Sequence, residues 1–269
     1  MIRVAVHGAG GRMGRGVIEC VCADPDAEFV GALEREGHPL LGKDAGLAAG
    51  RGEPLGVPIV ADVTRALERA DVVIDFSEPV AARALFEQCA ARKLAAVIGT
   101  TGLDAEAGAT VEQLAEVAAV VCAPNFSVGV NVLWALSAQA VRLLGAEFDI
   151  EVVEMHHKHK TDAPSGTALE LVRVVADVRG LDPEWAAVPG RLGQTGARGA
   201  EEIGVHSLRG GDVVGDHTLV LAGPGERLEL THRAHTRDIF ARGALRAAHW
   251  TLGRAPGLYD MADVLGLRG

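Results

Sequence analysis

Aromatic residues and lysine are scarce in this 269-residue chain. Phe, Trp and Tyr make up 4% of it, whereas hydrophobic residues make up 48%. We therefore expect cores built mainly from Ala, Val, Leu and Ile, and the length predicts two domains or one large one. The only lysines are Lys43, Lys93, Lys158 and Lys160. Two of them fall within one short segment, which makes that segment unusual in composition.

The sequence also lacks several features that mark particular classes of protein. The formal charge is −10 and no long basic run occurs, which argues against a nucleic-acid partner. No stretch of about 18 uncharged apolar residues appears, so we expect no membrane span. The first residues enter a predicted strand at once, so we expect no signal peptide. The cysteines, Cys20, Cys22, Cys89 and Cys122, show no C-x-x-C spacing and no disulfide framework. We predict a reduced, cytoplasmic protein.

The first half of the chain alternates short apolar runs with helical patterns. Strands are predicted at 2–6, 29–33, 72–76, 95–98 and 120–123, with helices between them. Such alternation is typical of a doubly wound parallel sheet in the α/β class. Strands of such sheets are buried on both faces and read as continuous apolar runs, as these do.

The pattern changes after residue 127. Helices are predicted at 128–145 and 165–179, a strand at 148–155 and a long loop at 183–204. Strand-like segments follow at 203–208, 216–221 and 227–231, and a last helix at 238–253. We predict a dinucleotide-binding domain at 1–127, completed by 237–269, and a second, mixed α+β domain at 128–236.

A glycine-rich turn joins the first predicted strand to the first predicted helix. Gly8-Ala9-Gly10-Gly11-Arg12-Met13-Gly14 departs from plain G-x-G-x-x-G, because its last glycine falls one place late. Glycines allow a tight turn and close approach to a pyrophosphate, and the helix N-terminus offers N–H groups to it. Glu34 ends the second strand and is suited to hydrogen-bond an adenosine ribose. This context favours a Rossmann-type cofactor site over an ordinary glycine-rich turn.

Residues near Glu34 and at two later strand ends extend this predicted site. Arg35 is suited to face a 2′-phosphate, whereas Glu34 prefers a free 2′-hydroxyl, so tolerance of both NADH and NADPH is predicted. A surface role for Arg35 is the alternative. The segments 99–102 and 123–127 follow strands and should border the nicotinamide, because ligands gather at the carboxyl ends of parallel strands.

The segment 154–167 concentrates basic and imidazole side chains. It contains His156, His157, His159 and both clustered lysines, and it leads into a helix with Ser165 as the expected N-cap. Lysine, imidazole and a helix N-terminus together suit a small dicarboxylate. Metal binding is disfavoured, because lysines interleave the histidines and no regular carboxylate spacing completes a ligand set. A solvated charged loop is the remaining alternative.

These segments together resemble the dihydrodipicolinate (4-hydroxy-tetrahydrodipicolinate) reductase family. The matching motifs are GAGGRMG, ALEREG, VIDFSEP, VIGTTG, NFSVGVN, HHKHKTDAPSGTA, GDHT and ERLELTHRA, in order across nearly the whole chain. The resemblance implies a second domain with a mixed sheet that binds substrate and builds a homotetramer. It also implies NADH- or NADPH-dependent reduction to tetrahydrodipicolinate in lysine and diaminopimelate biosynthesis. Glu78 departs from the family pattern, which has a basic residue there, and Pro124 replaces a smaller residue.

The resemblance assigns roles residue by residue. It implies that His156 is the proton donor/acceptor and Lys160 the second catalytic residue. The implied substrate contacts are His157, Gly166 and Thr167. The implied cofactor contacts are Gly8, Ala9, Gly10, Gly11, Arg12, Met13, Glu34, Arg35, Gly99, Thr100, Thr101, Ala123, Pro124, Asn125 and Phe126.

Two further expectations concern the charged segment and the choice of function. Lys158 should contribute less than Lys160 to substrate binding and turnover. In an extended strand both lysines would point to the same face, so this expectation requires a turn nearby, and residues 161–164 are turn-forming residues. The alternative functions are another Rossmann-type NAD(P) oxidoreductase and a non-enzymatic dinucleotide-binding redox sensor. A sugar-type dehydrogenase would be expected to carry Glu-Lys-Pro where residues 99–102 stand, and a sensor would not need the His-Lys cluster.

Overall fold

The chain forms two compact units in the computed structural model, which describes residues 1–268. Unit 1 comprises Met1–Val128 and Arg237–Gly269, and unit 2 comprises Gly129–Thr236. Each unit has its own sheet and its own hydrophobic core.

Unit 1 is built on a seven-stranded parallel sheet. Its strands are β1 (Ile2–His7), β2 (Ala27–Leu33), β3 (Ile59–Val60), β4 (Val72–Asp75), β5 (Ala95–Ile98), β6 (Ala119–Cys122) and β12 (Gly257–Tyr259). Their order across the sheet is β12-β6-β5-β4-β1-β2-β3. The chain thus moves outward in both directions from β1 and β4, which confirms the predicted doubly wound α/β fold.

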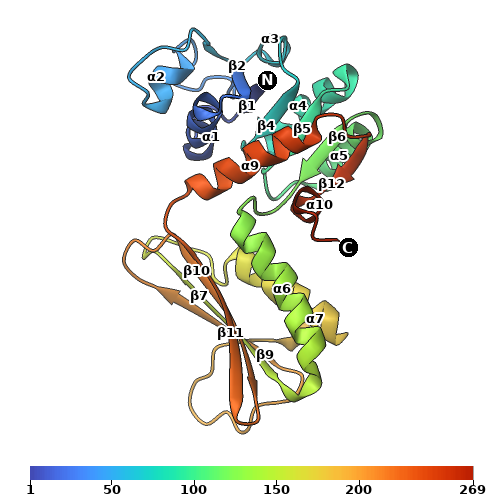
Figure 1. Ribbon diagram of the computed structural model, residues 1–269. Helices are drawn as coiled ribbons and strands as arrows, with labels where there is room; N and C mark the ends of the chain where they lie inside the picture. The colour runs from blue at the N-terminus through green and yellow to red at the C-terminus, as the bar shows by residue number, and fades with distance from the viewer. Residues whose placement is uncertain (269) are drawn as a thin grey trace. The chain divides into compact units, whose positions relative to one another are not determined.

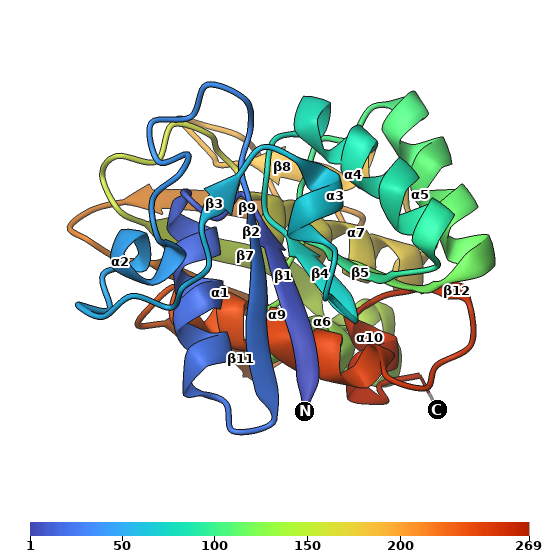
Figure 2. The same cartoon turned by 90° about the horizontal axis from the view of Figure 1, so that it is seen from above.

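Helices cover both faces of this sheet (Figure 2). One face carries α1 (Arg12–Ala23) and α9 (Asp238–Thr251), and the other carries α4 (Pro79–Arg92) and α5 (Ala105–Val117). Within β1, Val4 and Val6 pack on the α1 side while Ala5 packs on the α4 side. This alternation buries both faces of the strand, which explains the continuous apolar runs in the sequence. The shorter helices are α2 (Ala45–Ala49), α3 (Val63–Ala66) and α10 (Met261–Leu265).

Unit 2 is built on a five-stranded mixed sheet. Its strands are β7 (Asp149–His156), β8 (Ala187–Pro189), β9 (Ile203–Arg209), β10 (Gly215–Gly223) and β11 (Glu226–Ala234), in the order β11-β10-β7-β9-β8. β7 runs parallel to β9, whereas β10 is antiparallel to both β7 and β11. This confirms the predicted second α+β fold.

Two long helices, α6 (Val128–Leu144) and α7 (Gly166–Arg179), pack on one face of the unit 2 sheet (Figure 1). Along each strand, every second side chain faces these helices; Val152 of β7 and Leu219 of β10 are examples that are fully buried against them. The opposite face carries Glu151 on β7 and the largely exposed side chains of β11. The 3-10 helix η1 (Gly145–Glu147) follows α6 directly.

The predicted loop at 183–204 is partly ordered as secondary structure. It contains the short helix α8 (Pro183–Ala186), which Asp182 caps through its side chain, and strand β8, which pairs with β9. A four-residue helix and a three-residue strand are too short to show a periodic pattern, so the sequence prediction of a continuous loop was wrong here.

One helical stretch, Val128–Glu147, is long and apolar enough to cross a membrane by length and composition alone, with a mean hydropathy of 1.3. The same properties are those of a core helix. Val130, Leu133, Trp134 and Val141 of this stretch are buried in the unit 2 core. These four side chains therefore have a packing role within unit 2, whereas Leu136 and Leu143 of the same stretch are exposed.

Candidate functional site

The glycine-rich turn brings backbone atoms very close together at the start of α1. Gly8 has a φ of +76°, a conformation that favours glycine. A Cβ on Gly14 would lie 2.1 Å from the carbonyl oxygen of Gly8, so only glycine allows the helix to pack this closely on the turn. The N-cap of α1 is Gly11, and no side chain caps this helix, unlike α5 and α7. The first turn of α1 therefore fits an anionic pyrophosphate.

Glu34 lies at the end of β2, directly beside this turn. Its carboxylate accepts hydrogen bonds from the backbone N–H of Gly10 at 2.9 Å and of Arg35 at 3.0 Å. A neighbouring cavity of about 240 Å³ is lined by Glu34, Arg35, His38 and Glu78, among others. The predicted acidic and basic partners of the ribose end of a dinucleotide thus line one cavity together with Glu78.

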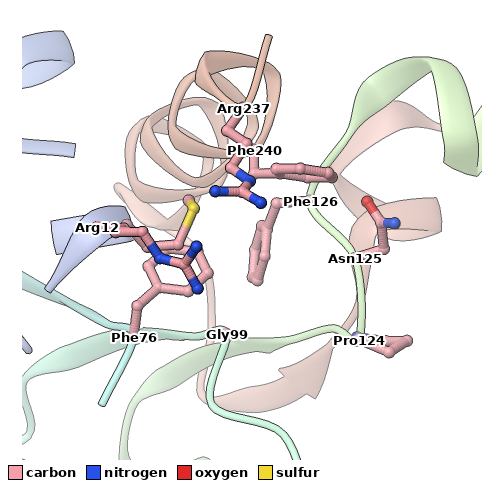
Figure 3. Close-up of a pocket in the computed structure, with 9 residues that line it drawn as sticks. Arg12, Phe76, Gly99, Pro124, Asn125, Phe126, Arg237 and Phe240 are labelled. Carbon is pink, nitrogen blue, oxygen red and sulfur yellow. The ribbon is translucent and has the colours of Figure 1, made fainter. Parts of the chain in front are cut away.

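A second cavity of unit 1, of about 350 Å³, brings together residues from the start of α1, the loops after β4, β5 and β6, and the start of α9. It is lined by Arg12, Met13, Phe76, Gly99, Pro124, Asn125, Phe126, Arg237 and Phe240. Figure 3 shows the guanidinium groups of Arg12 and Arg237 directed toward the same space, beside the ring of Phe126. The rings of Phe76 and Phe126 meet edge to face with centroids 5.7 Å apart. The cavity thus offers aromatic surface and two cationic groups.

Both predicted strand-end loops contribute to this region, although not every predicted residue lines a cavity wall. Thr100 is buried, and its hydroxyl oxygen accepts a hydrogen bond from the N–H of Ser77 at 2.9 Å. Thr101 is exposed and Ala123 is buried. Asn125 accepts a hydrogen bond from the N–H of Ser127 at 2.8 Å, which shapes the loop after β6.

In unit 2, His156 at the end of β7 forms a dyad with Glu154. The distance from His156 Nδ1 to Glu154 Oε2 is 2.5 Å, and the Glu154 side chain is fully buried. Arg209 on β9 binds both carboxylate oxygens of Glu154, each at 2.9 Å. Burial favours the neutral carboxyl, but the hydrogen bonds from Arg209 and His156 outweigh it and lower the pKa of Glu154 to about 2. Glu154 is therefore a carboxylate at neutral pH.

The pKa of His156 lies below its ordinary value of 6.5. Burial is the main cause, and the positive charges of Lys160 and Arg209 add to it, while Glu154 opposes both effects. The surroundings of His156 therefore favour its uncharged ring more than water does.

A second histidine, His217 on β10, stands beside this dyad. Its ring meets that of His156 edge to face with centroids 5.2 Å apart. Its Nε2 lies 3.0 Å from the hydroxyl of Ser165, which also caps α7 by accepting the N–H of Ala168. Burial and the neighbouring His156 lower the pKa of His217 to about 4, so it stays uncharged at neutral pH.

The two clustered lysines differ in their surroundings, because a turn follows β7. The N–H of Lys160 donates to the carbonyl of His157 at 3.1 Å, which closes a turn over 157–160, slightly before the turn-forming residues 161–164. Lys160 Nζ lies 2.8 and 2.9 Å from the two carboxylate oxygens of Asp162, with 20% of its side chain exposed. Lys158 and His159 are exposed, and His157 is half-buried.

Gly166 and Thr167 form the first turn of α7, as predicted. The indole Nε1 of Trp134 on α6 donates to the carbonyl of Thr167 at 3.3 Å, which fixes this turn against the core of unit 2. A Cβ at Gly166 would meet no atom within 4 Å, so space remains open at the helix start. Within residues 1–268 no group of three or more His, Cys, Asp or Glu side chains is arranged to hold a metal ion.

Comparison with known proteins identifies the family of this chain. Residues 2–126 match the family model described as dihydrodipicolinate reductase, N-terminus, and residues 129–265 match that described as dihydrodipicolinate reductase, C-terminus. The chain belongs to the dihydrodipicolinate reductase family. This confirms the resemblance drawn from the motifs, and it makes the chain an oxidoreductase that uses NADH or NADPH.

Individual relatives match over their full length. A 4-hydroxy-tetrahydrodipicolinate reductase from Anaeromyxobacter dehalogenans (strain 2CP-C) is 54% identical over 269 residues, which are 100% of this chain and 99% of the relative. One from Syntrophotalea carbinolica is 50% identical over 268 residues, with 100% of both chains covered. A solved structure of dipicolinate-bound dihydrodipicolinate reductase from Paenisporosarcina sp. TG-14 has a TM-score of 0.77 at 27% identity, covering 98% of each chain.

Sequence reasoning did not single out several residues that shape these sites. Phe76, Arg237 and Phe240 line the larger cavity of unit 1, and Arg209 and His217 contact the His156 region of unit 2. Phe76 and His217 do stand inside the quoted motifs VIDFSEP and GDHT, which was the available signal. Arg209, Arg237 and Phe240 stand in no quoted motif, and only the fold brings them to their places.

Proposed function

We propose that this dihydrodipicolinate reductase family member reduces 4-hydroxy-tetrahydrodipicolinate to tetrahydrodipicolinate, with unit 1 binding the dinucleotide and unit 2 the dicarboxylate. The observation that carries the proposal is the His156–Glu154 dyad placed beside Lys160 and the start of α7. A plain dinucleotide-binding sensor has no need of such a group. The full-length similarity to named reductases supports the same pathway, lysine and diaminopimelate biosynthesis.

For the cofactor, the proposal assigns contacts to the glycine-rich turn, Glu34, Arg35 and the loops 99–101 and 123–126. The uncapped start of α1 would hold the pyrophosphate, and Arg12 and Arg237 would add positive charge beside it. Glu34 and Arg35 line one cavity, so both a free 2′-hydroxyl and a 2′-phosphate find a partner there. Glu78 in the same cavity disfavours the phosphate, which tilts the balance toward NADH.

For the substrate, the proposal assigns Lys160, His157, Gly166 and Thr167 to the two carboxylates. Lys160 already binds a carboxylate in this structure, that of Asp162, which is 62% exposed. An exposed ion pair of this kind is weak, so a substrate carboxylate can replace Asp162 at little cost. A charge-assisted hydrogen bond from Lys160 to the substrate would contribute about 1.5–3 kcal/mol.

The reduction needs one hydride and one proton. The C4 hydroxyl of the substrate would first leave as water, which gives the conjugated ring. A bound reduced nicotinamide would supply the hydride to C4 of this ring, and the electron pair of the ring double bond would move toward the imine and leave an enamine. His156 then gives a proton to C3, and Lys160 increases the electrophilicity of the ring by pairing with its carboxylate. Positioned proton transfer of this kind contributes roughly 10²–10⁴-fold to the rate.

For its assembly, we propose a cytoplasmic homotetramer built through unit 2. No helix within residues 1–268 covers one face of its sheet, and Leu228 on the edge strand β11 is 41% exposed. An open sheet of this kind favours association with another copy. Light scattering at micromolar concentration should give four times the chain mass of 28.0 kDa. A stable monomer there would contradict the tetramer.

The activity is tested in a coupled assay. The protein is mixed with NADH, pyruvate, aspartate semialdehyde and the upstream synthase, and the absorbance of the reduced nicotinamide is followed. We expect oxidation of NADH only when the synthase and both of its substrates are present. Oxidation that does not depend on the synthase would favour a different Rossmann-type oxidoreductase, and no oxidation at all would favour a sensor.

The residue roles are tested by three single variants under the same assay. His156→Ala should lower kcat by roughly 10²–10³-fold with a much smaller change in KM. Lys160→Met should lower turnover and weaken substrate binding while leaving cofactor affinity, measured by fluorescence, nearly intact. Lys158→Met is the matched control, since Lys158 is exposed. Equal damage from the two lysine variants, or near-normal turnover of His156→Ala, would refute these roles.

A further inference from the structure

We propose that Glu154 is a positioning residue for the reduction: it holds His156 through Nδ1, so that Nε2 is the atom that exchanges the proton, and it stabilises the imidazolium. Arg209 keeps Glu154 ionised for this purpose. The inference rests on the proposed role of His156 and adds Glu154 and Arg209 as the groups that prepare His156 for proton transfer.

The strand geometry of unit 2 places these groups on one face of the sheet. Glu154 and His156 are two residues apart on β7, so their side chains share a face. Across the parallel pairing, His156 stands opposite Arg209 of β9. Across the antiparallel pairing, Glu154 stands opposite His217 of β10. The arrangement therefore depends on the register of three strands.

The hydrogen bonds of Glu154 decide which nitrogen of His156 carries hydrogen. Oε1 accepts from Arg209 Nη2 at 2.9 Å and from the N–H of Ser165 at 3.2 Å, while Oε2 accepts from Arg209 Nη1 at 2.9 Å. With a pKa of about 2, Glu154 has no proton to donate. The 2.5 Å contact must then be donated by His156, so Nδ1 carries the hydrogen. In the neutral ring, Nε2 is left as the basic atom.

The surroundings of Nε2 are kept open by Gly215. A Cβ at Gly215 would lie 3.0 Å from His156 Nε2, closer than most real Cβ contacts. Glycine at this position of β10 therefore leaves room for a ligand atom at the nitrogen that must reach the substrate. This second observation points to the same nitrogen as the Glu154 hydrogen bond.

The charges around His156 explain why an anion is needed there. Lys160 and Arg209 are both positive and disfavour the imidazolium, and burial acts in the same direction. His217 adds no charge at neutral pH, since its pKa is about 4. Asp162 neutralises Lys160 only in part, being largely exposed. Glu154 is thus the one buried anion that stabilises the proton-donating form of His156 among the described groups packed on it.

A purely structural ion pair is the competing explanation, and β7 contains a matched example. Glu151, three residues earlier, binds Arg191, Arg198 and His206, and these hydrogen bonds outweigh burial to give its carboxyl a pKa of about 2 as well. It differs in facing away from His156, on the other side of the sheet. Glu151→Gln is therefore the control for losing an ion-paired carboxylate from this strand.

The test compares Glu154→Gln with Glu151→Gln in the full-length enzyme. A proton donor is active in its protonated form, so activity falls as pH rises through the pKa of His156. Removing the negative charge of Glu154 lowers that pKa, so the fall in kcat should move to lower pH by about 1 unit or more. At pH 7, kcat should drop about 10-fold or more with a smaller change in KM. Glu151→Gln should leave the pH profile in place.

The tautomer of His156 is measured separately, by NMR of protein carrying ¹⁵N-labelled histidine, with His156→Ala used to assign the signals. We expect the Nδ1–H form in the wild-type protein and a mixture of tautomers in Glu154→Gln. An Nε2–H form in the wild type, or equal pH profiles for both variants, would overturn the inference. A different failure, normal turnover of His156→Ala with the Nδ1–H form present, would refute the proposed role of His156 and leave the positioning by Glu154 standing.

Discussion

His217 should make the protein lose stability between pH 7 and pH 5, and His217→Gln should remove that loss. The side chain is 3% exposed, and within residues 1–268 its Nδ1 has no hydrogen-bond partner. Protonation would therefore place a charge and an N–H group without an acceptor in the core, which is why burial, with the nearby His156, lowers the pKa to about 4.

The size of this effect follows from linkage between folding and proton binding. The folded pKa of about 4 lies below the ordinary value of 6.5, so between these values the unfolded chain binds a proton that the folded protein does not. Stability from this source is present above pH 6.5 and is lost as the pH falls toward 4. At pH 5 the loss relative to pH 7 is about 2 kcal/mol.

The assay is urea unfolding at pH 7 and pH 5, at one fixed protein concentration because the proposed association of subunits would add to apparent stability. Glutamine is uncharged and retains a group able to bond the hydroxyl of Ser165. His217→Gln should lose about 2 kcal/mol less than the wild type between the two pH values. The exposed His235→Gln is the control and should behave as the wild type. Equal losses for the wild type and His217→Gln would refute the assignment of a buried neutral His217.

Two further predictions concern the cofactor and the space at His156. The values of kcat/KM for NADH and NADPH should lie within about tenfold of each other, or about 1.4 kcal/mol. Arg35→Ala should lower kcat/KM for NADPH more than for NADH, and equal losses of kcat/KM would show that Arg35 does not bind the 2′-phosphate. Gly215→Ala should lower kcat well below wild type at unchanged cofactor affinity, because its Cβ would crowd His156 Nε2; wild-type kcat in a folded variant would contradict that steric argument.

The sheet of unit 1 could be predicted because burial on both faces leaves a plain signature. Continuous apolar runs such as 72–74 and Ala95–Ile98 mark its central strands. The edge strands β3 and β12 were missed, since they contain two and three residues and pair along one side only. Short edge strands take their conformation from the neighbouring strand, so their own residues show no pattern.

Candidate site residues could be named from the sequence where one contiguous segment contains them. The turn from Gly8 to Gly14 and the residues His156 to Thr167 are local, and the physical demands of a tight turn and a helix start are visible in their residue types. Arg209 contacts Glu154 across 55 positions of sequence, and Phe240 reaches its cavity from a helix that begins more than 100 residues after Phe126. Contacts of this kind depend on strand register and helix packing, which a single sequence does not encode in any local pattern.

The two glutamates of β7 show why composition alone does not make a site. Glu151 and Glu154 both bind arginine and histidine, and both have a pKa of about 2. Glu151 lies on the sheet face that α6 and α7 leave uncovered, where its partner His206 is 34% exposed. Glu154 lies on the covered face, where Ser165 donates to it from the start of α7 and Gly215 leaves room at the bound histidine. An odd or even position along one strand therefore decides which carboxylate stabilises the surface and which one prepares a histidine for proton transfer.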